Sequence, residues 1–188
     1  MFWKKKEKIS IEKLWSDHLQ PLFDGAVNQA VAIGDKNGLD LDKGNLTLNT
    51  DILFFHLFGK VLGLFRINGL DDRAIMMLIF HANSIIQERF GDDEAIPMLE
   101  SLRDMRAQKV PFYQRFEEGL SKDNICEIDF GSALAAPLFD INNLKDVSSQ
   151  LALDLVEFHR SLFTILLGKC RWCSAHLEIV SGQSNKNE

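Results

Sequence analysis

The stretch that decides the fold is residues 144–172, LKDVSSQLALDLVEFHRSLFTILLGKCRW. Its apolar residues recur at spacings of three and four, which is the period of one face of an α-helix. They are Leu144, Val147, Leu151, Leu155, Phe158, Leu162 and Leu166. We therefore expect a long amphipathic helix over 144–172, with this stripe packed against the rest of the protein.

A similar period marks the N-terminal part of the chain. An apolar series runs through 11–33 and is interrupted by Pro21. Proline cannot donate a backbone hydrogen bond, so the series predicts either a kink or a helix that restarts with proline in its first turn. Residues 34–45 are rich in glycine, aspartate and asparagine, and this composition predicts a loop.

The middle of the chain continues the helical pattern with interruptions. We expect a second helix over 50–68, capped within residues 49–50, and a third helix that starts near residue 71 and ends at residue 90. Residues 92–120 are expected to be helical but broken by prolines. Residues 121–143 show no clear period, which predicts an irregular segment: a long loop, a short β excursion or a lid.

Together these segments predict an all-α, single-domain helical bundle of about five or six helices, mostly up-and-down. The domain is expected over residues 1–180. A disordered tail is expected over 181–188, where the composition is polar. The chain lacks alternating apolar and polar runs, which favours helices over strands.

The charge balance limits the partners that the chain can bind. Its 188 residues carry a net charge of −6, which argues against a broad nucleic-acid surface. The longest apolar stretch, 52–67, is about 16 residues long and includes charged side chains, so we expect no membrane span. Three cysteines without an export signal predict free thiols and a cytoplasmic location.

The expected central helix has an unusual polar side. It is apolar nearly all round, so it should lie in the middle of the bundle. Its other residues, His56, Gly59, Lys60, Gly63 and Arg66, gather in one sector of the helix. Three interpretations stay open: a glycine-floored groove for an anionic ligand, a homodimer contact, and a narrow solvated stripe without a function.

Three histidines directly follow a phenylalanine in the middle of apolar helices: His56, His81 and His159. Histidines that converge inside a bundle can bind a small molecule, a metal ion or haem. With Lys60 they form the predicted ligand-binding set His56, Lys60, His81 and His159. The usual metal-ligand spacings are missing, so the sequence leaves any cofactor unidentified. Histidines that are merely hydrogen-bonded at a core margin are the alternative.

A second candidate site lies near the end of the chain. Cys170, Cys173 and His176 could supply three ligands of a zinc site. A fourth ligand is not evident from the sequence. Burial of the two cysteines as small apolar residues is the simpler account.

Arg171 and His176 also have the Arg-x4-His spacing. This spacing resembles that of small helical ribonucleases of the HEPN class. The resemblance covers six residues plus the helical bundle, and Trp172 stands where the family usually has Asn, Asp or His. It implies that Arg171 and His176 would cleave RNA as the active pair of a dimer.

The sequence contains no phosphate-binding loop, dinucleotide fingerprint or nucleophile elbow. We therefore expect a non-enzymatic protein that acts through protein–protein interaction or regulation, with a homodimer as the expected form. The first alternative is a small-molecule, metal or haem binder that uses the helix-borne histidines. The second is a HEPN-like nuclease.

Overall fold

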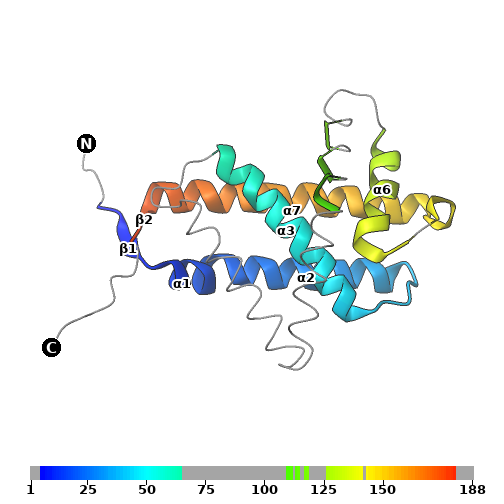
Figure 1. Cartoon of the computed structure of the whole chain (residues 1–188), viewed down its shortest axis with the longest axis horizontal. Coiled ribbons are helices and arrows are strands. Elements are labelled where there is room, and N and C mark those ends of the chain that lie inside the picture. Colours follow the sequence, from blue (N-terminus) through cyan, green and yellow to red (C-terminus); the bar gives the residue numbers. More distant parts are fainter. Residues whose placement is uncertain are drawn as a thin grey trace.

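Three long helices carry the fold: α2 (Gln20–Lys36), α3 (Lys43–Leu64) and α7 (Ser149–His176). In Figure 1, α2 and α7 run along the long axis and α3 crosses over them. The computed structural model describes residues 5–64, 109–111, 113–114, 117–118, 126–141 and 143–180. The predicted all-α class is confirmed in these residues. The helix expected between residues 71 and 90 and the tail 181–188 lie outside them.

Pro21 lies in the first turn of α2, as in one of the two outcomes that the sequence predicts, but the chain before it is also helical. Helix α1 (Ile11–Leu14) leads into a single π-helical turn, η1 (Trp15–Leu19), and α2 then begins with Pro21 in its first turn. A proline in the first turn loses no helical hydrogen bond, because the first amides of a helix have no partner within it. The wider π turn accommodates Pro21, and the backbone stays helical from α1 through η1 into α2.

Helix α3 begins earlier than the sequence predicts. Asp42 caps it: its Oδ1 accepts hydrogen bonds from the backbone amides of Gly44 at 2.9 Å and Asn45 at 3.1 Å. The expected cap at residues 49–50 was therefore wrong. Both residues lie inside the helix, and the Thr50 hydroxyl donates to the carbonyl of Leu46 one turn back. No residue from Leu46 to Phe58 is exposed, which confirms that this helix is central.

The expectation of an irregular segment over 121–143 was wrong for 127–139, which form helix α6 (Glu127–Phe139). No residue from Phe130 to Phe139 is exposed, so this part of the helix is apolar on all sides and shows no 3.6-residue period. Pro137 lies in the last turn, close to the end of the helix at Asp140, whose φ is 55°. There it breaks little of the hydrogen-bonding pattern.

Helix α7 follows the predicted stripe but with shifted bounds. A 3-10 turn, η2 (Leu144–Asp146), precedes it, and the α-helix begins after Ser148, whose hydroxyl oxygen accepts from the amide of Leu151 at 3.1 Å. It continues to His176 and buries Leu151, Leu155, Phe158, Leu162 and Leu166. The amphipathic pattern thus predicted the buried face correctly.

Two short strands, which the sequence did not predict, join the ends of the described chain. β1 (Glu7–Ile9) pairs in parallel with β2 (Leu177–Ile179), with Ile9 opposite Ile179. They lie together at one end of the molecule (Figure 1). Three residues are too few to produce a recognisable alternating pattern. The strands fix the first helix against the last turn of α7.

The long helices share one hydrophobic core. It includes Phe23 of α2, Phe54 and Phe58 of α3, Phe130 of α6 and Phe158 of α7, each at most 1% exposed. Within the described residues no helix is both long enough and apolar enough to cross a membrane.

The contact between α6 and α7 depends on the missing side chain of Gly131. A Cβ atom there would lie 2.0 Å from the backbone oxygen of Ala152, far inside van der Waals contact. The two helices can therefore approach this closely only with glycine at position 131.

We expect Gly131→Ala to destabilise the protein by about 1–3 kcal/mol, because the two backbones must move apart. Thermal denaturation followed by circular dichroism should show a melting temperature lower by several degrees. Gly25→Ala in α2 is the matched control, because a Cβ atom there meets nothing within 4 Å. It should raise stability by about 0.5–1 kcal/mol through helix propensity. Equal behaviour of the two variants would contradict this account of the α6–α7 contact.

Candidate functional site: a carboxylate shared by two histidines and a lysine

The most concentrated group of polar side chains surrounds the carboxylate of Glu117. Its Oε1 lies 2.9 Å from Nε2 of His159, and its Oε2 lies 3.0 Å from Nε2 of His56. The ammonium group of Lys60 also binds Oε2. Both oxygens of one carboxylate are thus held by three basic side chains. We call His56, Lys60 and His159 the basic triad.

Three segments far apart in the sequence supply these groups. His56 and Lys60 lie one turn apart on α3 and so share a face. His159 lies on α7, which packs directly against α3. Glu117 belongs to the segment 109–118, of which residues 109–111, 113–114 and 117–118 are described and helical. The carboxylate therefore joins this segment to two helices of the core.

Aromatic rings hold both imidazoles in place. The ring of Tyr113 stacks on His56 with 5.6 Å between centroids, and Phe130 of α6 meets His159 edge-on at 5.1 Å. The side chains of His56 and His159 are only 4% and 12% exposed. Each ring thus has an apolar neighbour on one side and the carboxylate at its Nε2 atom.

The hydrogen bonds fix the protonation of the site. A carboxylate only accepts, so Nε2 of each histidine carries a proton and donates it. Burial alone would raise the pKa of Glu117, but the hydrogen bonds from His159, His56 and Lys60 outweigh it and hold this pKa well below its ordinary value of 4.5. Glu117 is therefore the fixed negative charge of the site.

Three of the four residues in the predicted ligand-binding set thus meet at one point: His56, Lys60 and His159. His81 lies outside the described residues. The sequence did not single out Glu117, because a glutamate among other charged residues in a proline-broken stretch carries no distinguishing pattern. Two features of the sequence pointed to this place: the polar sector of the central helix, through His56 and Lys60, and the Phe-His pairs, through His56 and His159.

A second polar group anchors the other end of the segment 109–118. The ammonium of Lys109 binds the side-chain oxygen of Asn49, the carbonyl of Pro137 at 2.7 Å and the carboxylate of Asp140 at 3.2 Å. Asn49 also donates to the carbonyl of Leu138 at 3.0 Å. A cation and an amide thus satisfy the last carbonyls of α6. This group has a structural role, since each polar atom named here has a partner.

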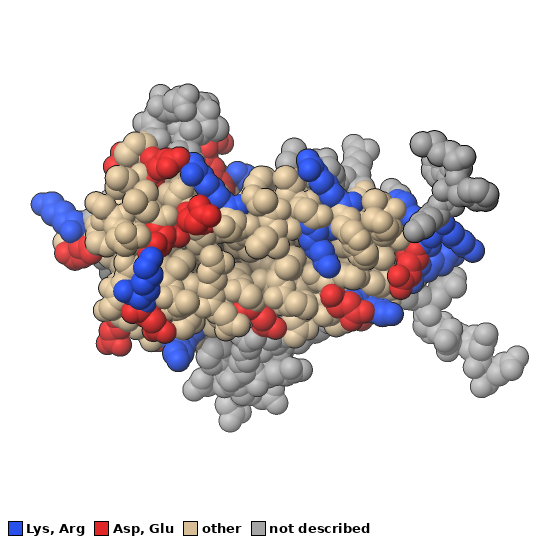
Figure 2. Space-filling model, turned by 180° about the vertical axis from the view of Figure 1, so that it is seen from behind, with Lys and Arg blue, Asp and Glu red and all other residues tan. Residues whose placement is uncertain are grey.

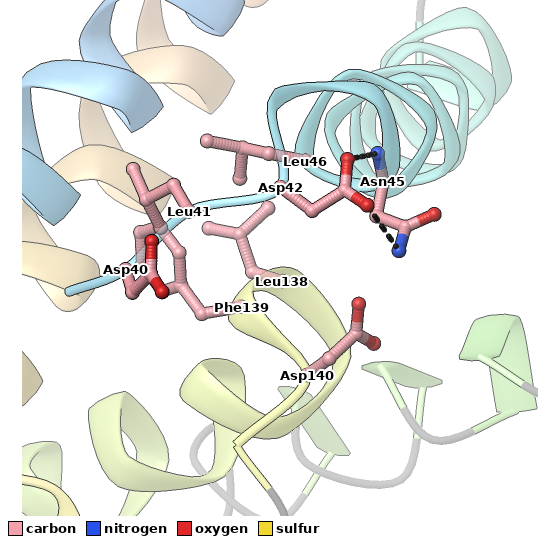
Figure 3. Close-up of a pocket in the computed structure, with 8 residues that line it drawn as sticks. All are labelled: Asp40, Leu41, Asp42, Asn45, Leu46, Leu138, Phe139 and Asp140. Carbon is pink, nitrogen blue, oxygen red and sulfur yellow. Dashed lines mark hydrogen bonds between the residues drawn. The ribbon is translucent and has the colours of Figure 1, made fainter.

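A cavity of about 170 Å³ lies beside this second group, between the start of α3 and the end of α6 (Figure 3). Asp40, Asp42 and Asp140 line it, together with Asn45 and apolar side chains. The carboxylate of Asp42 is turned toward Asn45 and caps α3, and that of Asp140 binds Lys109. Two of the three carboxylates are therefore already engaged by the fold.

The three predicted metal ligands, Cys170, Cys173 and His176, do not converge on one point as the basic triad does. Cys170 and Cys173 are each 1% exposed on the inner face of α7. Burial raises the pKa of Cys170 to about 12, with a further contribution from Cys173, which favours the neutral thiol. His176 is exposed, and its Nδ1 donates to the carbonyl of Trp172 at 2.8 Å. Among the described residues, no group of three or more His, Cys, Asp or Glu side chains is arranged to hold a metal ion.

The residues behind the HEPN resemblance both lie near the exposed end of α7. The helix continues unbroken to His176, so residues 171 and 176 point about 140° apart around its axis. Within one chain, Arg171 and His176 therefore do not face a common point.

The outer face of α7 carries apolar side chains that are partly exposed, although His176 stacks on the ring of Trp172 and Lys169 lies over it. Ile165 is 48% exposed and Trp172 is 42% exposed. Between them lies Gly168, where an added Cβ would meet nothing within 4 Å. Figure 2 shows the side of the molecule away from α3, where uncharged surface lies between several Lys, Arg, Asp and Glu side chains. This surface is a candidate for contact with another protein.

Comparison with known proteins adds no functional assignment. The chain matches no protein family, and neither a curated protein nor a solved structure is significantly similar to it.

We expect Glu117→Gln to destabilise the protein by about 3 kcal/mol at pH 7, because the amide leaves buried basic groups without their counter-charge. The folded-state pKa of Glu117 is lowered, so its contribution is fully present above about pH 4.5 and is lost as the pH falls further. Urea denaturation of both proteins from pH 7 to pH 3 measures this. The difference in the free energy of unfolding between the wild type and Glu117→Gln should shrink only below about pH 4.5.

The control for this measurement is Glu157→Gln, which makes the same chemical change at an exposed position of α7. A surface substitution of this kind should change stability by no more than about 0.5 kcal/mol. Two results would contradict the conclusion that Glu117 is a buried negative charge. One is a loss of unfolding free energy in Glu117→Gln as small as in the control, and the other is a loss that grows between pH 4.5 and pH 3.

Proposed function

We propose that the protein is a non-enzymatic helical protein that works by binding a protein partner, and that its first partner is a second copy of the same chain. The observation that carries this proposal is the exposed outer face of α7, with Ile165 and Trp172 seven residues apart. Seven residues are two helical turns, so both side chains lie on the same side of the helix.

The same face has a pattern of small residues that suits close helix packing. Ser161, Gly168 and Ala175 follow one another at intervals of seven. Gly168 and Ala175 are exposed, and Ser161 is half-buried. Small residues let the backbones of two helices approach closely, while larger apolar neighbours fill the flanks. Ile165 and Trp172 both lie on one flank of this row, about 60° and 40° around the helix from Gly168.

The arrangement is also self-complementary, which favours a copy of the chain over an unrelated partner. Ser161 and Ala175 lie equally far before and after Gly168. In a two-fold, antiparallel pairing centred on Gly168, Ser161 of one copy would therefore face Ala175 of the other. Ile165 would lie near Trp172 of the second copy. A surface that pairs with itself in this way is what a two-fold dimer requires.

Ligand binding is the second candidate function, and a specific observation favours it. His56, Lys60 and His159 converge on one carboxylate although they come from two different helices. Such convergence of basic groups suits an anionic ligand. Partner binding at α7 and ligand binding at the basic triad use different surfaces, so the two functions are compatible.

We expect the purified protein to be a dimer at micromolar concentration and Ile165→Glu to weaken the dimer at least about tenfold, because the substitution places a charge in an apolar contact. Sedimentation equilibrium gives the dissociation constant of each protein directly.

Leu153→Glu is the matched control. Leu153 is 44% exposed on the same helix but points about 120° away from Ile165 around the axis. This variant should dimerise like the wild type. A wild-type protein that stays monomeric throughout the micromolar range would overturn the proposal. Equal weakening by both substitutions would overturn the choice of this face.

A further inference from the structure

The basic triad has the features of a binding site for a carboxylate group. His159 donates to one oxygen of Glu117, while His56 and Lys60 bind the other. Two oxygens on one planar group, each met by donors from a different helix, make a two-point contact. All three contacts of the triad with Glu117 are therefore made to its carboxylate group. The rest of the side chain places this group between the three basic side chains.

Both imidazoles of the triad have a ring neighbour besides Glu117: Tyr113 stacks on His56, and Phe130 meets His159 edge-on. α3 and α7 pack directly on each other through the core, so their contact does not rest on Glu117 alone. Phe130 of α6 keeps the ring of His159 in place. Binding sites that are largely preformed lose little free energy to ordering when a ligand enters.

The triad also reaches the surface on one side. The Lys60 side chain is 42% exposed, whereas that of Glu117 is 10% exposed. Gly59 beside it is exposed, and a Cβ there would meet nothing within 4 Å. A small anion can therefore approach along Lys60, whose charge lies at the entrance.

We propose that His56, Lys60 and His159 form a receptor for a carboxylate group, that Glu117 occupies it as a built-in ligand, and that the carboxylate of a small organic acid can take its place. The proposal rests on the ligand-binding function and is independent of the dimer at α7. It names the class of ligand as a small monocarboxylate, and entry of the ligand would release Glu117 from α3 and α7.

The test uses the full chain with Glu117→Ala, which removes the built-in carboxylate and leaves the triad. Acetate at pH 7 should stabilise this variant, and chloride at the same ionic strength should not. Above the dissociation constant, each tenfold rise in acetate should raise the melting temperature by about 3–6 °C. If the variant is unfolded in chloride, the same titration is followed as recovery of the helical circular dichroism signal.

Three controls assign the effect to the triad. Glu117→Gln fills the same space, so acetate should have no place to bind. Glu117→Ala combined with Lys60→Met should lose most of the acetate effect. Asp154→Ala removes a carboxylate that binds Lys36 at 2.9 Å on the surface, and it should not respond to acetate beyond its response to chloride.

Direct evidence comes from the imidazole nitrogen signals of His56 and His159 in the Glu117→Ala protein, which acetate should shift in a saturable manner. Absence of any acetate-specific stabilisation or recovery of folding would overturn the proposal. An equal response to phosphate would also overturn it, since the site would then be a general anion site. Sedimentation of the same samples shows separately whether the protein is a dimer, so failure of one proposal is not mistaken for failure of the other.

Discussion

The arrangement around Glu117 depends on one constraint: a carboxylate removed from water must be surrounded by donors. Losing hydration costs an ionised group several kcal/mol, which only well-placed partners offset. His56, Lys60 and His159 supply these partners from α3 and α7. Because the donors must all reach one group, the constraint fixes how the segment 109–118 sits on the two helices.

The two ends of that segment are held by opposite charges. At one end the cation of Lys109 enters a group of oxygen atoms at the end of α6, and at the other the anion of Glu117 enters a group of basic nitrogens. Neither group could be exchanged for the other without placing like charges together. Electrostatics therefore sets the direction in which the segment lies across the core as well as its position.

The sequence predicted those parts in which one side of a helix differs from the other. The stripe of α7 was visible for this reason, and the place of Pro21 in a first turn followed from its missing backbone donor. Helix α6 was missed because it is buried nearly all round, so Gly131 and Pro137 suggested a loop, whereas one allows close packing and the other lies in the last turn. The capping role of Asp42 was hidden among the polar residues of a loop.

The candidate site divides in the same way. Its basic half could be predicted because His56, Lys60 and His159 interrupt strongly apolar helices, where a polar residue needs a partner. Its acidic half could not, because a glutamate becomes recognisable only when the fold brings it to those partners. Helix α7 then links the two candidate functions: His159 faces inward, and Ile165 points outward less than two turns later. The two candidate functions therefore use different sides of the same helix and can be tested separately.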